Sequence, residues 1–295
     1  MSEDIGRPVV VGIDGSESAR QAAFWAADEA VRRGVSVRLV DAVDVNPSAY
    51  RGAAPRPLGF IDALKADARK ALIGVRSEIR ARHAELPVDT AVPPRSAVPA
   101  LVEESKGAQL VVLGSRGLGG FTGILVGSTA VALVAHGHCP VAVIRGDVAA
   151  AGPVVVGVDG SSTSEAAVAL AFEEASLRGV ELVAVHTWVE YLSDVAYTTA
   201  RQFLMDWDAV ERHEVESVAE RLAGWQEKYP DVTVRRVVLR DRPVRCLLAE
   251  SIGAQLLVVG SRGHGGFSGM LVGSTSQALV YHATCPLLVA RHSSR

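Results

Sequence analysis

A glycine-rich segment between residues 114 and 129 has the residue types best suited to holding an anion. It contains Gly114, Ser115, Arg116 and Gly117, followed by Gly127, Ser128 and Thr129. Glycine lets the backbone approach a ligand closely. A helix that opens at Gly127 would present N–H groups and the positive end of its dipole, and the two hydroxyls add donors there. The segment therefore predicts a site for a phosphate chain, with a flexible loop before a capped helix as the alternative.

The same segment occurs twice in the chain. Residues 111–129 match residues 257–275 at 14 of 19 positions, and residues 9–16 match residues 154–161 at seven of eight. A mere connecting loop could change freely after duplication, so the repetition favours the binding interpretation. We expect two complete domains at residues 1–147 and 153–295, joined by a linker at about 146–153 and able to pack as an internal pseudo-dimer.

An aspartate follows the first apolar run of each half. These residues are Asp14 and Asp159. A carboxylate at the end of a strand could accept hydrogen bonds from ribose hydroxyls or from an adenine amine. The alternative is a structural aspartate that forms a turn or caps a helix.

Strand and helix patterns alternate through each half. In the first half we expect strands at 9–13, 35–43, 88–92, 109–114 and 139–144, and helices from Ser16 or Ser18 to Arg33, at 61–86, at 97–105 and from about 127. Short, continuous apolar runs are typical of strands buried on both faces. The pattern predicts an α/β fold of two tandem doubly wound domains, each with a parallel sheet flanked by helices. Ligands bind at the carboxyl ends of such strands, where neighbouring first and fourth strands would bring Asp14 to the glycine-rich segment.

Several familiar motifs are absent from the sequence. It has no Gly-Lys dipeptide for a Walker A loop, its glycines do not fit G-x-G-x-x-G, and it has no G-x-S-x-G. What remains is Gly-x2-Gly-x9-Gly-Ser, which begins at Gly114 and again at Gly260, each time with an aspartate upstream. With the His-x-x-Cys-Pro sequence near the end of each half, it resembles the ATP-binding signature of the universal stress protein family over essentially the whole chain.

The resemblance implies a five-stranded parallel sheet of order 3-2-1-4-5 in each half. It also implies one ATP per half, accompanied by Mg²⁺, with no metal ligand supplied by the protein. Adenosine would contact Asp14 and Asp159, and the adenine side would be lined by Gly12, Ala42, Gly157 and Thr187. The ribose and phosphates would lie on Gly114, Ser115, Arg116 and Gly117, and on Gly260, Ser261, Arg262 and Gly263. The phosphate tail would be held by Gly127, Ser128 and Thr129, and by Gly273, Ser274 and Thr275.

Two features of these loops add to the expectation. Arg116 and Arg262 lie within them and could pair with phosphate. Leu118 of the first half is replaced by His264 in the second, which would give the two sites a different affinity or pH response.

The composition sets limits on the class of protein. The 295 residues are 48% hydrophobic and 21% charged, with a net charge of −3, so they can fill a core and do not favour a general nucleic-acid binder. No apolar run reaches the roughly 18 residues that span a bilayer. The N-terminus has no secretory signal, and three cysteines cannot form a disulfide framework. We expect a cytoplasmic protein without nucleic-acid or membrane partners.

The expected function is nucleotide-dependent regulation rather than catalysis. The motif loops offer amides and hydroxyls but no second acid and no lysine for ATP hydrolysis, so no catalytic residue is assigned. The alternative is a slow ATPase or a nucleotidyl-transfer enzyme, with a substrate pocket in loops 44–60 and 189–203; a third possibility is a scaffold used only for dimerisation. The family resemblance implies a role in stress response or growth control, and a homodimer in addition to the internal pair.

Overall fold

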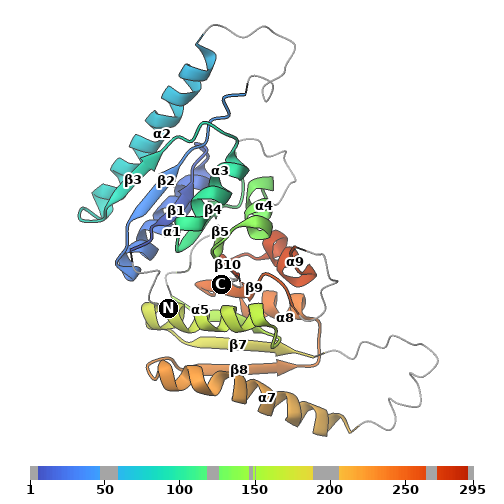
Figure 1. Cartoon of the computed structure of the whole chain (residues 1–295). Coiled ribbons are helices and arrows are strands. Elements are labelled where there is room, and N and C mark those ends of the chain that lie inside the picture. Colours follow the sequence, from blue (N-terminus) through green and yellow to red (C-terminus); the bar gives the residue numbers. More distant parts are fainter. Residues whose placement is uncertain are drawn as a thin grey trace, which may run out of the picture.

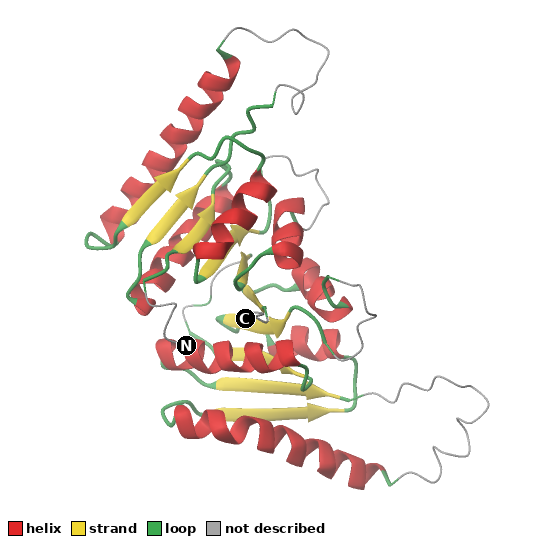
Figure 2. Cartoon of the chain, viewed as in Figure 1, coloured by secondary structure: helices red, strands yellow, loops and turns green. Residues whose placement is uncertain are grey.

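The structure is a computed structural model that describes residues 6–46, 59–117, 126–145, 149, 151–188, 206–263 and 271–291. Most of the loop 44–60 and all of the loop 189–203 lie outside these residues, as do Leu118 and His264. The described chain forms one ten-stranded sheet with helices on both faces (Figures 1 and 2).

The first half alternates strands and helices as the apolar pattern predicts. Its elements are β1 (Val9–Gly12), α1 (Glu17–Arg33), β2 (Val37–Val40), α2 (Phe60–Arg82), β3 (Val88–Ala91), α3 (Ala97–Glu104), a 3₁₀ turn (Ser105–Gly107), β4 (Leu110–Gly114), α4 (Ser128–His136) and β5 (Val141–Ile144). The strands are parallel in the order β3-β2-β1-β4-β5. This is the order 3-2-1-4-5 that the family resemblance implies.

The second half repeats this arrangement. Its elements are β6 (Val154–Val158), α5 (Ser162–Arg178), β7 (Leu182–Thr187), α7 (Trp207–Lys228), β8 (Val234–Leu239), α8 (Pro243–Glu250), β9 (Leu256–Gly260), α9 (Ser274–His282) and β10 (Leu287–Ala290). Its strand order is β8-β7-β6-β9-β10, again parallel.

The two halves join through their last strands. β5 and β10 run antiparallel, with Ala142 opposite Leu288 at the centre of the pairing. Each of these strands would otherwise leave an edge of unpaired N–H and C=O groups. The pairing makes two five-stranded sheets into one continuous sheet, which was not predicted from the sequence.

The core forms two layers, one on each face of this sheet. Val9 and Val11 of β1 pack with α1 and α2, while Val10 packs on the other face with residues of α3 and α4. Successive side chains of a strand point to opposite faces. Because both faces are covered, the strand is apolar at every one of these positions, as the sequence indicates.

Local capping signals set the limits of the first helix. Ser16 accepts a hydrogen bond of 3.1 Å from the backbone N–H of Ala19, and Gly34 ends the helix in the left-handed region with φ 65°. Ser16 is one of the two predicted starts of this helix, and the helix ends at Arg33 as predicted. The second strand is shorter than the predicted 35–43 and ends at Val40.

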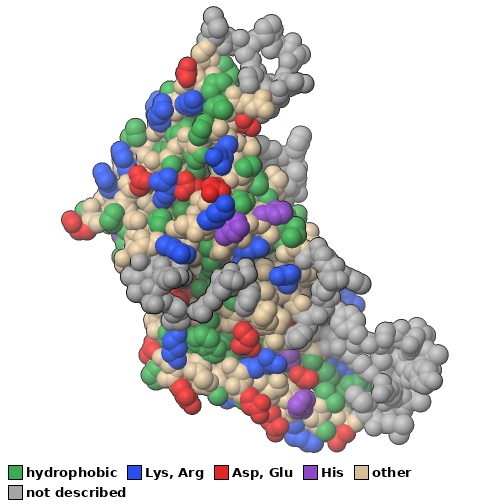
Figure 3. Space-filling model, in the orientation of Figure 1, with side chains coloured by type: hydrophobic (Ala, Val, Ile, Leu, Met, Phe, Trp, Pro, Cys, Tyr) green, Lys and Arg blue, Asp and Glu red, His purple; other side chains and the backbone are tan. Residues whose placement is uncertain are grey.

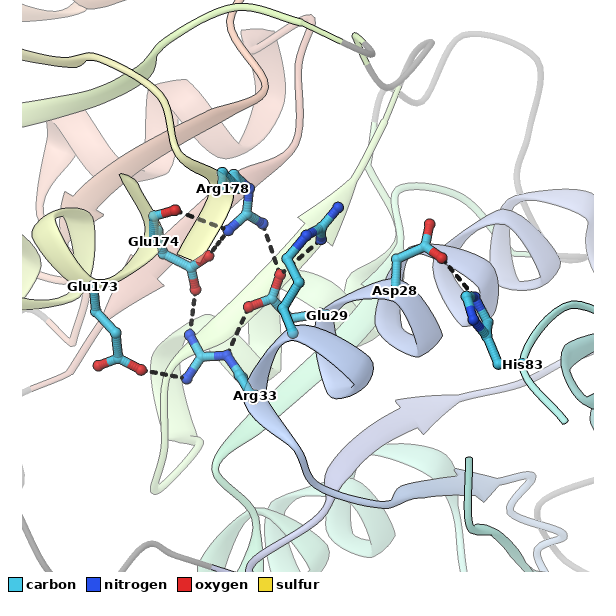
Figure 4. A network of polar contacts seen from close by, with 8 residues as sticks. Asp28, Glu29, Arg33, His83, Glu173, Glu174 and Arg178 are labelled. Atoms are coloured by element: carbon cyan, nitrogen blue, oxygen red, sulfur yellow. Dashed lines mark hydrogen bonds and ion pairs between the residues drawn. The ribbon is translucent and has the colours of Figure 1, made fainter. Parts of the chain in front are cut away.

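A buried group of charges lies where α1 meets α5 (Figure 4). Glu29 and Arg33 come from α1, and Glu174 and Arg178 from α5; each arginine contacts the glutamate of its own helix and that of the other helix. Both glutamate side chains are fully buried. The opposite charges can remain in this dry position only because each has more than one partner.

Candidate nucleotide sites

Asp14 occupies a tight turn two residues after the end of β1. Its Oδ1 atom accepts a hydrogen bond of 3.0 Å from the N–H of Ser16, across Gly15 with φ 83°. Asp159 makes the matching contact of 2.9 Å with Ser161. One carboxylate oxygen of each aspartate therefore forms the turn, as the structural alternative predicts.

The other oxygen, Oδ2, faces the loop that follows the fourth strand. A Cβ atom built on Gly117 would lie 2.3 Å from Oδ2 of Asp14, and one on Gly263 would lie 2.4 Å from Oδ2 of Asp159. Such separations are far below van der Waals contact, so any larger residue at either position would force the carboxylate to move. The structure thus brings together the two features that the sequence predicts to share a crevice.

The glycine that ends the fourth strand is required for a different reason. A Cβ on Gly114 would meet the backbone of Ser18 at 2.6 Å, and one on Gly260 would meet that of Thr163 at 2.8 Å. Gly114 and Gly260 therefore let the N-terminal turn of α1 or α5 pack directly on the strand end.

Hydroxyl groups of that N-terminal turn orient the loop. Ser16 Oγ donates to the carbonyl of Arg116 at 3.3 Å, and the N–H of Arg116 donates to Ser18 Oγ at 3.4 Å. In the second half, Thr163 Oγ1 donates to the carbonyl of Arg262. Because C=O and N–H point in opposite directions across a trans peptide, these contacts turn the next amide N–H away from α1 or α5.

That amide lies toward the N-terminus of the following helix. The amide nitrogen of Gly117 is 4.0 Å from a Cβ built on Gly127, the residue that precedes α4. Gly127 itself donates to the carbonyl of Ser115 at 2.8 Å. Among the residues that the structure describes, no side chain caps α4 or the equivalent α9, so their first amide groups face the loop without a described side-chain acceptor. Ser128 and Thr129 lie in this first turn.

The residues expected on the adenine side are more widely placed. Ala42 follows β2, and Thr187 ends β7, both beside the first strand of their half. Gly12 lies within β1, where a Cβ would meet Leu113 at 2.5 Å. In the second half a Cβ on Gly157 would be 3.3 Å from Leu247. The missing side chain of these two glycines accommodates core packing, and their place on the adenine side stays a prediction.

Both halves match the Universal stress protein family, at residues 6–145 and 151–291. The chain belongs to the universal stress protein family. It is 42% identical over 293 residues to the universal stress protein Rv2623 of Mycobacterium tuberculosis H37Rv, covering 97% of this chain and 96% of the relative. It is 43% identical over 293 residues to Rv2005c of the same strain, covering 97% of each.

A solved structure agrees with the tandem fold of this universal stress protein. The crystal structure of a universal stress protein from Archaeoglobus fulgidus DSM 4304 superimposes with a TM-score of 0.70 at 22% identity, covering 97% of this chain and 96% of that one. At that identity the likeness concerns the fold alone. The predicted family, the α/β class and the tandem arrangement are confirmed.

A carboxylic acid that sequence reasoning missed lies beside Asp14 in this universal stress protein. Asp41 directly follows β2, and its burial, together with the charge of Asp14, raises its pKa to about 6. The strand register puts His186 at the same position of the second half. His186 Nδ1 donates to the carbonyl of Val158 at 2.7 Å, and Nε2 lies 3.0 Å from Glu214. Comparing residues 41 and 186 across the repeat would have revealed this difference.

A second arginine in each half was also missed. The backbone N–H of Ser115, at the start of the glycine loop, donates a hydrogen bond of 3.0 Å to the carbonyl of Ile144. Arg145 directly follows Ile144 and therefore lies next to the loop. Ser261 makes the same contact of 2.9 Å to Ala290, which precedes Arg291. The offset of 146 between Arg145 and Arg291 was the signal in the sequence that could have found them.

Two kinds of feature are absent from the described part of the chain. Among them, no helix is long and apolar enough to cross a membrane. Within the same residues, no group of three or more His, Cys, Asp or Glu side chains is placed to hold a metal ion. On the face shown in Figure 3, acidic and basic side chains are interspersed over both halves.

Proposed function

We propose that this universal stress protein binds ATP at two sites, one in each half, and acts as a nucleotide-dependent regulator in stress response or growth control. The observation that carries the proposal is the placement of Gly117 against Asp14, repeated by Gly263 against Asp159. In each half an aspartate for the nucleoside lies next to a glycine loop and a helix N-terminus suited to phosphate.

The adenosine end of each site lies toward the second strand of the half. Asp14 and Ala42 are on this side in the first half, and Asp159 and Thr187 in the second. The phosphates extend across the glycine loop to the first turn of α4 or α9. Arg116 and Arg262 are exposed on this path, and no ion pair joins either of them to a carboxylate among the described residues. Mg²⁺ would accompany the phosphates without a protein ligand.

Hydrolysis is the second candidate, because Asp41 adds a carboxyl group with a pKa of about 6 to the first site. Its location argues against a role as the base. In the order β2-β1-β4, the end of β2 lies two strands from the end of β4, or about 10 Å at the usual strand spacing. Asp41 is therefore on the adenosine side, away from the terminal phosphate, and we expect ATP to be bound with little turnover.

Native mass spectrometry of the purified protein, followed by calorimetric titration with Mg·ATP, tests the proposal. We expect two adenine nucleotides per chain. A protein that carries none and shows no heat of binding would overturn the binding proposal and favour a scaffold. Turnover of order 1–100 per second would identify an enzyme instead, and loss of that turnover in Asp41→Asn would assign the base.

The oligomeric state is a separate part of the proposal. The edges of the last strands, β5 and β10, already pair within the chain, which leaves β3 and β8 as the outer strands of the sheet. We expect a homodimer that forms without β5 or β10. Analytical ultracentrifugation with and without ATP measures this directly, and a monomer in both conditions would contradict it.

A further inference from the structure

Arg145 connects the two halves at the end of a helix that belongs to the other half. It follows β5 in the first half, and its guanidinium donates to the carbonyls of Val280, Tyr281 and Ala283 at the C-terminus of α9 in the second. The distances to Val280 and Ala283 are 3.1 and 3.3 Å. The last carbonyls of a helix have no partner within it, so Arg145 acts as their cap.

Arg291 makes the reciprocal connection. It follows β10 in the second half and donates to the carbonyl of Val134, near the C-terminus of α4 in the first half. The two contacts are related by the same repeat that relates the two proposed sites. A chance surface contact would have no reason to occur at both positions.

Each arginine also adjoins the glycine loop of its own half. The backbone hydrogen bond from Ser115 to Ile144 places Arg145 beside Arg116. The equivalent hydrogen bond from Ser261 to Ala290 places Arg291 beside Arg262. Burial and then the positive charge of Arg116 lower the pKa of Arg145. Each loop therefore has two neighbouring positive charges, one of them partly removed from water.

The helices that receive these arginines begin at the proposed phosphate sites. α4 starts after Gly127 of the first site, and α9 after Gly273 of the second. Each helix has nine residues, a length of about 13 Å. Between them lies an apolar cavity of about 260 Å³, lined in part by Val131, Val134 and Val280. The pocket leaves space between the facing sides of the two helices.

We propose that Arg145 and Arg291 couple the two nucleotide sites, so that ATP bound at one site strengthens binding at the other. This inference rests on the proposed function, because it concerns the regulation of the same sites. Phosphate at the first site offsets the repulsion between Arg116 and Arg145, which favours the position of Arg145 on α9. A better-held α9 presents its N-terminal amides more firmly to phosphate at the second site, and Arg291 does the same for α4.

The sign and symmetry of the effect follow from linkage. If ATP at the first site raises affinity at the second, ATP at the second must raise affinity at the first by the same factor. An isolated charge at a helix C-terminus changes affinity by about two- to fivefold. We expect a coupling of this size between the two binding steps.

The decisive experiment removes one site and changes the arginine of that same half. In the Gly117→Asp background only the second site binds ATP, and Arg145→Met is then added. Calorimetry should show ATP binding to the second site about two- to fivefold weaker in Gly117→Asp than in the chain with an intact first site, and Arg145→Met should remove that difference, although Arg145 belongs to the first half. Arg38→Met in the same background is the matched control, since Arg38 pairs with Glu104 and Asp89 within the first half, away from α9. It should leave the affinity of the second site unchanged.

The mirror experiment uses Gly263→Asp with Arg291→Met and measures the first site. A second-site affinity that is the same with the first site intact or removed, or a difference that Arg145→Met leaves unchanged, would overturn the coupling and leave the proposed function intact. An effect of Arg145→Met that Arg38→Met reproduces would also overturn it, since general destabilisation would then be the cause. If the wild-type chain binds no ATP, the proposed function fails, and the coupling fails with it.

Discussion

Oδ2 of Asp14 lies 2.3 Å from the point at which a Cβ on Gly117 would sit. These residues are 103 positions apart in the chain, yet the carboxylate occupies the space that any side chain at 117 would need. The second half repeats the relationship between Asp159 and Gly263 at 2.4 Å. In each proposed site, the aspartate expected on the nucleoside side therefore lies against the backbone expected on the phosphate side.

This relationship predicts graded effects of substituting the glycine. Gly117→Ala should displace the Asp14 carboxylate and weaken ATP binding at the first site by about tenfold, or ~1.4 kcal/mol. Gly117→Asp adds a negative charge where phosphate should lie, and should remove one ATP per chain. Native mass spectrometry counts the bound nucleotides. The double variant Gly117→Asp, Gly263→Asp should carry none.

The control for these variants is Gly224→Asp on α7. A Cβ there meets nothing within 4 Å, so the substitution adds the same charge without entering a site. It should retain two ATP. Two bound ATP in the Gly117, Gly263 double variant would show that the site lies elsewhere.

The exposed arginine of the loop predicts a salt-sensitive contribution to binding. Arg116→Ala should weaken ATP binding at the first site by about fivefold, equivalent to ~1 kcal/mol. The difference from wild type should shrink as ionic strength rises, because salt screens an exposed charge. Titrations at two salt concentrations measure this. Arg80→Ala, on the exposed surface of α2, is the control; an equal loss there would mean that only net charge matters.

Asp41 predicts a pH-dependent change in stability confined to the first half. Its pKa in the folded protein is raised from the ordinary 3.8 to about 6, so the folded state binds its proton more tightly than the unfolded state does. The free energy of unfolding should therefore fall as pH rises from about 4 to about 6. Asp41→Asn should remove this penalty and stabilise the protein at pH 7.5 by on the order of 1 kcal/mol, after allowance for solvent screening.

Urea unfolding at pH 7.5 and pH 4.5 checks this expectation. The advantage of Asp41→Asn should be present at the higher pH and largely absent at the lower one. Asp67→Asn, which changes an exposed carboxylate on α2, should have no such dependence. An advantage of Asp41→Asn that is the same at both values would exclude titration of Asp41 as the cause.

The buried charges between α1 and α5 predict that replacing one charged residue destabilises the protein more than replacing both members of a pair. Arg178 Nη2 donates to Oε2 of Glu29 at 2.7 Å, and both side chains are buried. The neighbouring arginines outweigh the effect of burial and lower the pKa of Glu29. Glu29→Ala would leave Arg33 and Arg178 without this carboxylate in a dry interface, at a cost of about 3 kcal/mol.

Replacing both partners, as in Glu29→Met, Arg178→Met, should recover part of that loss, because no single charge is then stranded. Chemical unfolding of the wild type, Glu29→Ala and the double variant measures these differences in the free energy of unfolding. Glu17→Gln, which alters an exposed ion pair with Arg20, should cost far less than Glu29→Ala, because water screens that pair. A cost of Glu29→Ala as small as that of Glu17→Gln would show that water reaches the network.

The sequence by itself determined the elements, the duplication and the residue types of each site. These depend on signals that act over a few residues: Ser16 begins a helix, Gly34 ends one, and continuous apolar runs form strands buried on both faces. It also predicted that Asp14 and Gly117 would meet, since neighbouring first and fourth strands are common in such sheets. The second strand spans Val37–Val40 instead of the predicted 35–43, although the N–H groups of Asp41 and Val43 still donate to the carbonyls of Ala91 and Pro93 at 3.1 Å.

Only the tertiary structure decided which distant side chains share an environment. The antiparallel pairing of β5 with β10 brings Arg145 to α9 and Arg291 to α4, and the register of β2 on β1 brings Asp41 to Asp14. Glu29 and Arg178 are 149 residues apart and meet only because the two halves pack together. Burial and charge act over a few ångströms in space, so their effects at these residues depend on packing that no local pattern in the sequence encodes.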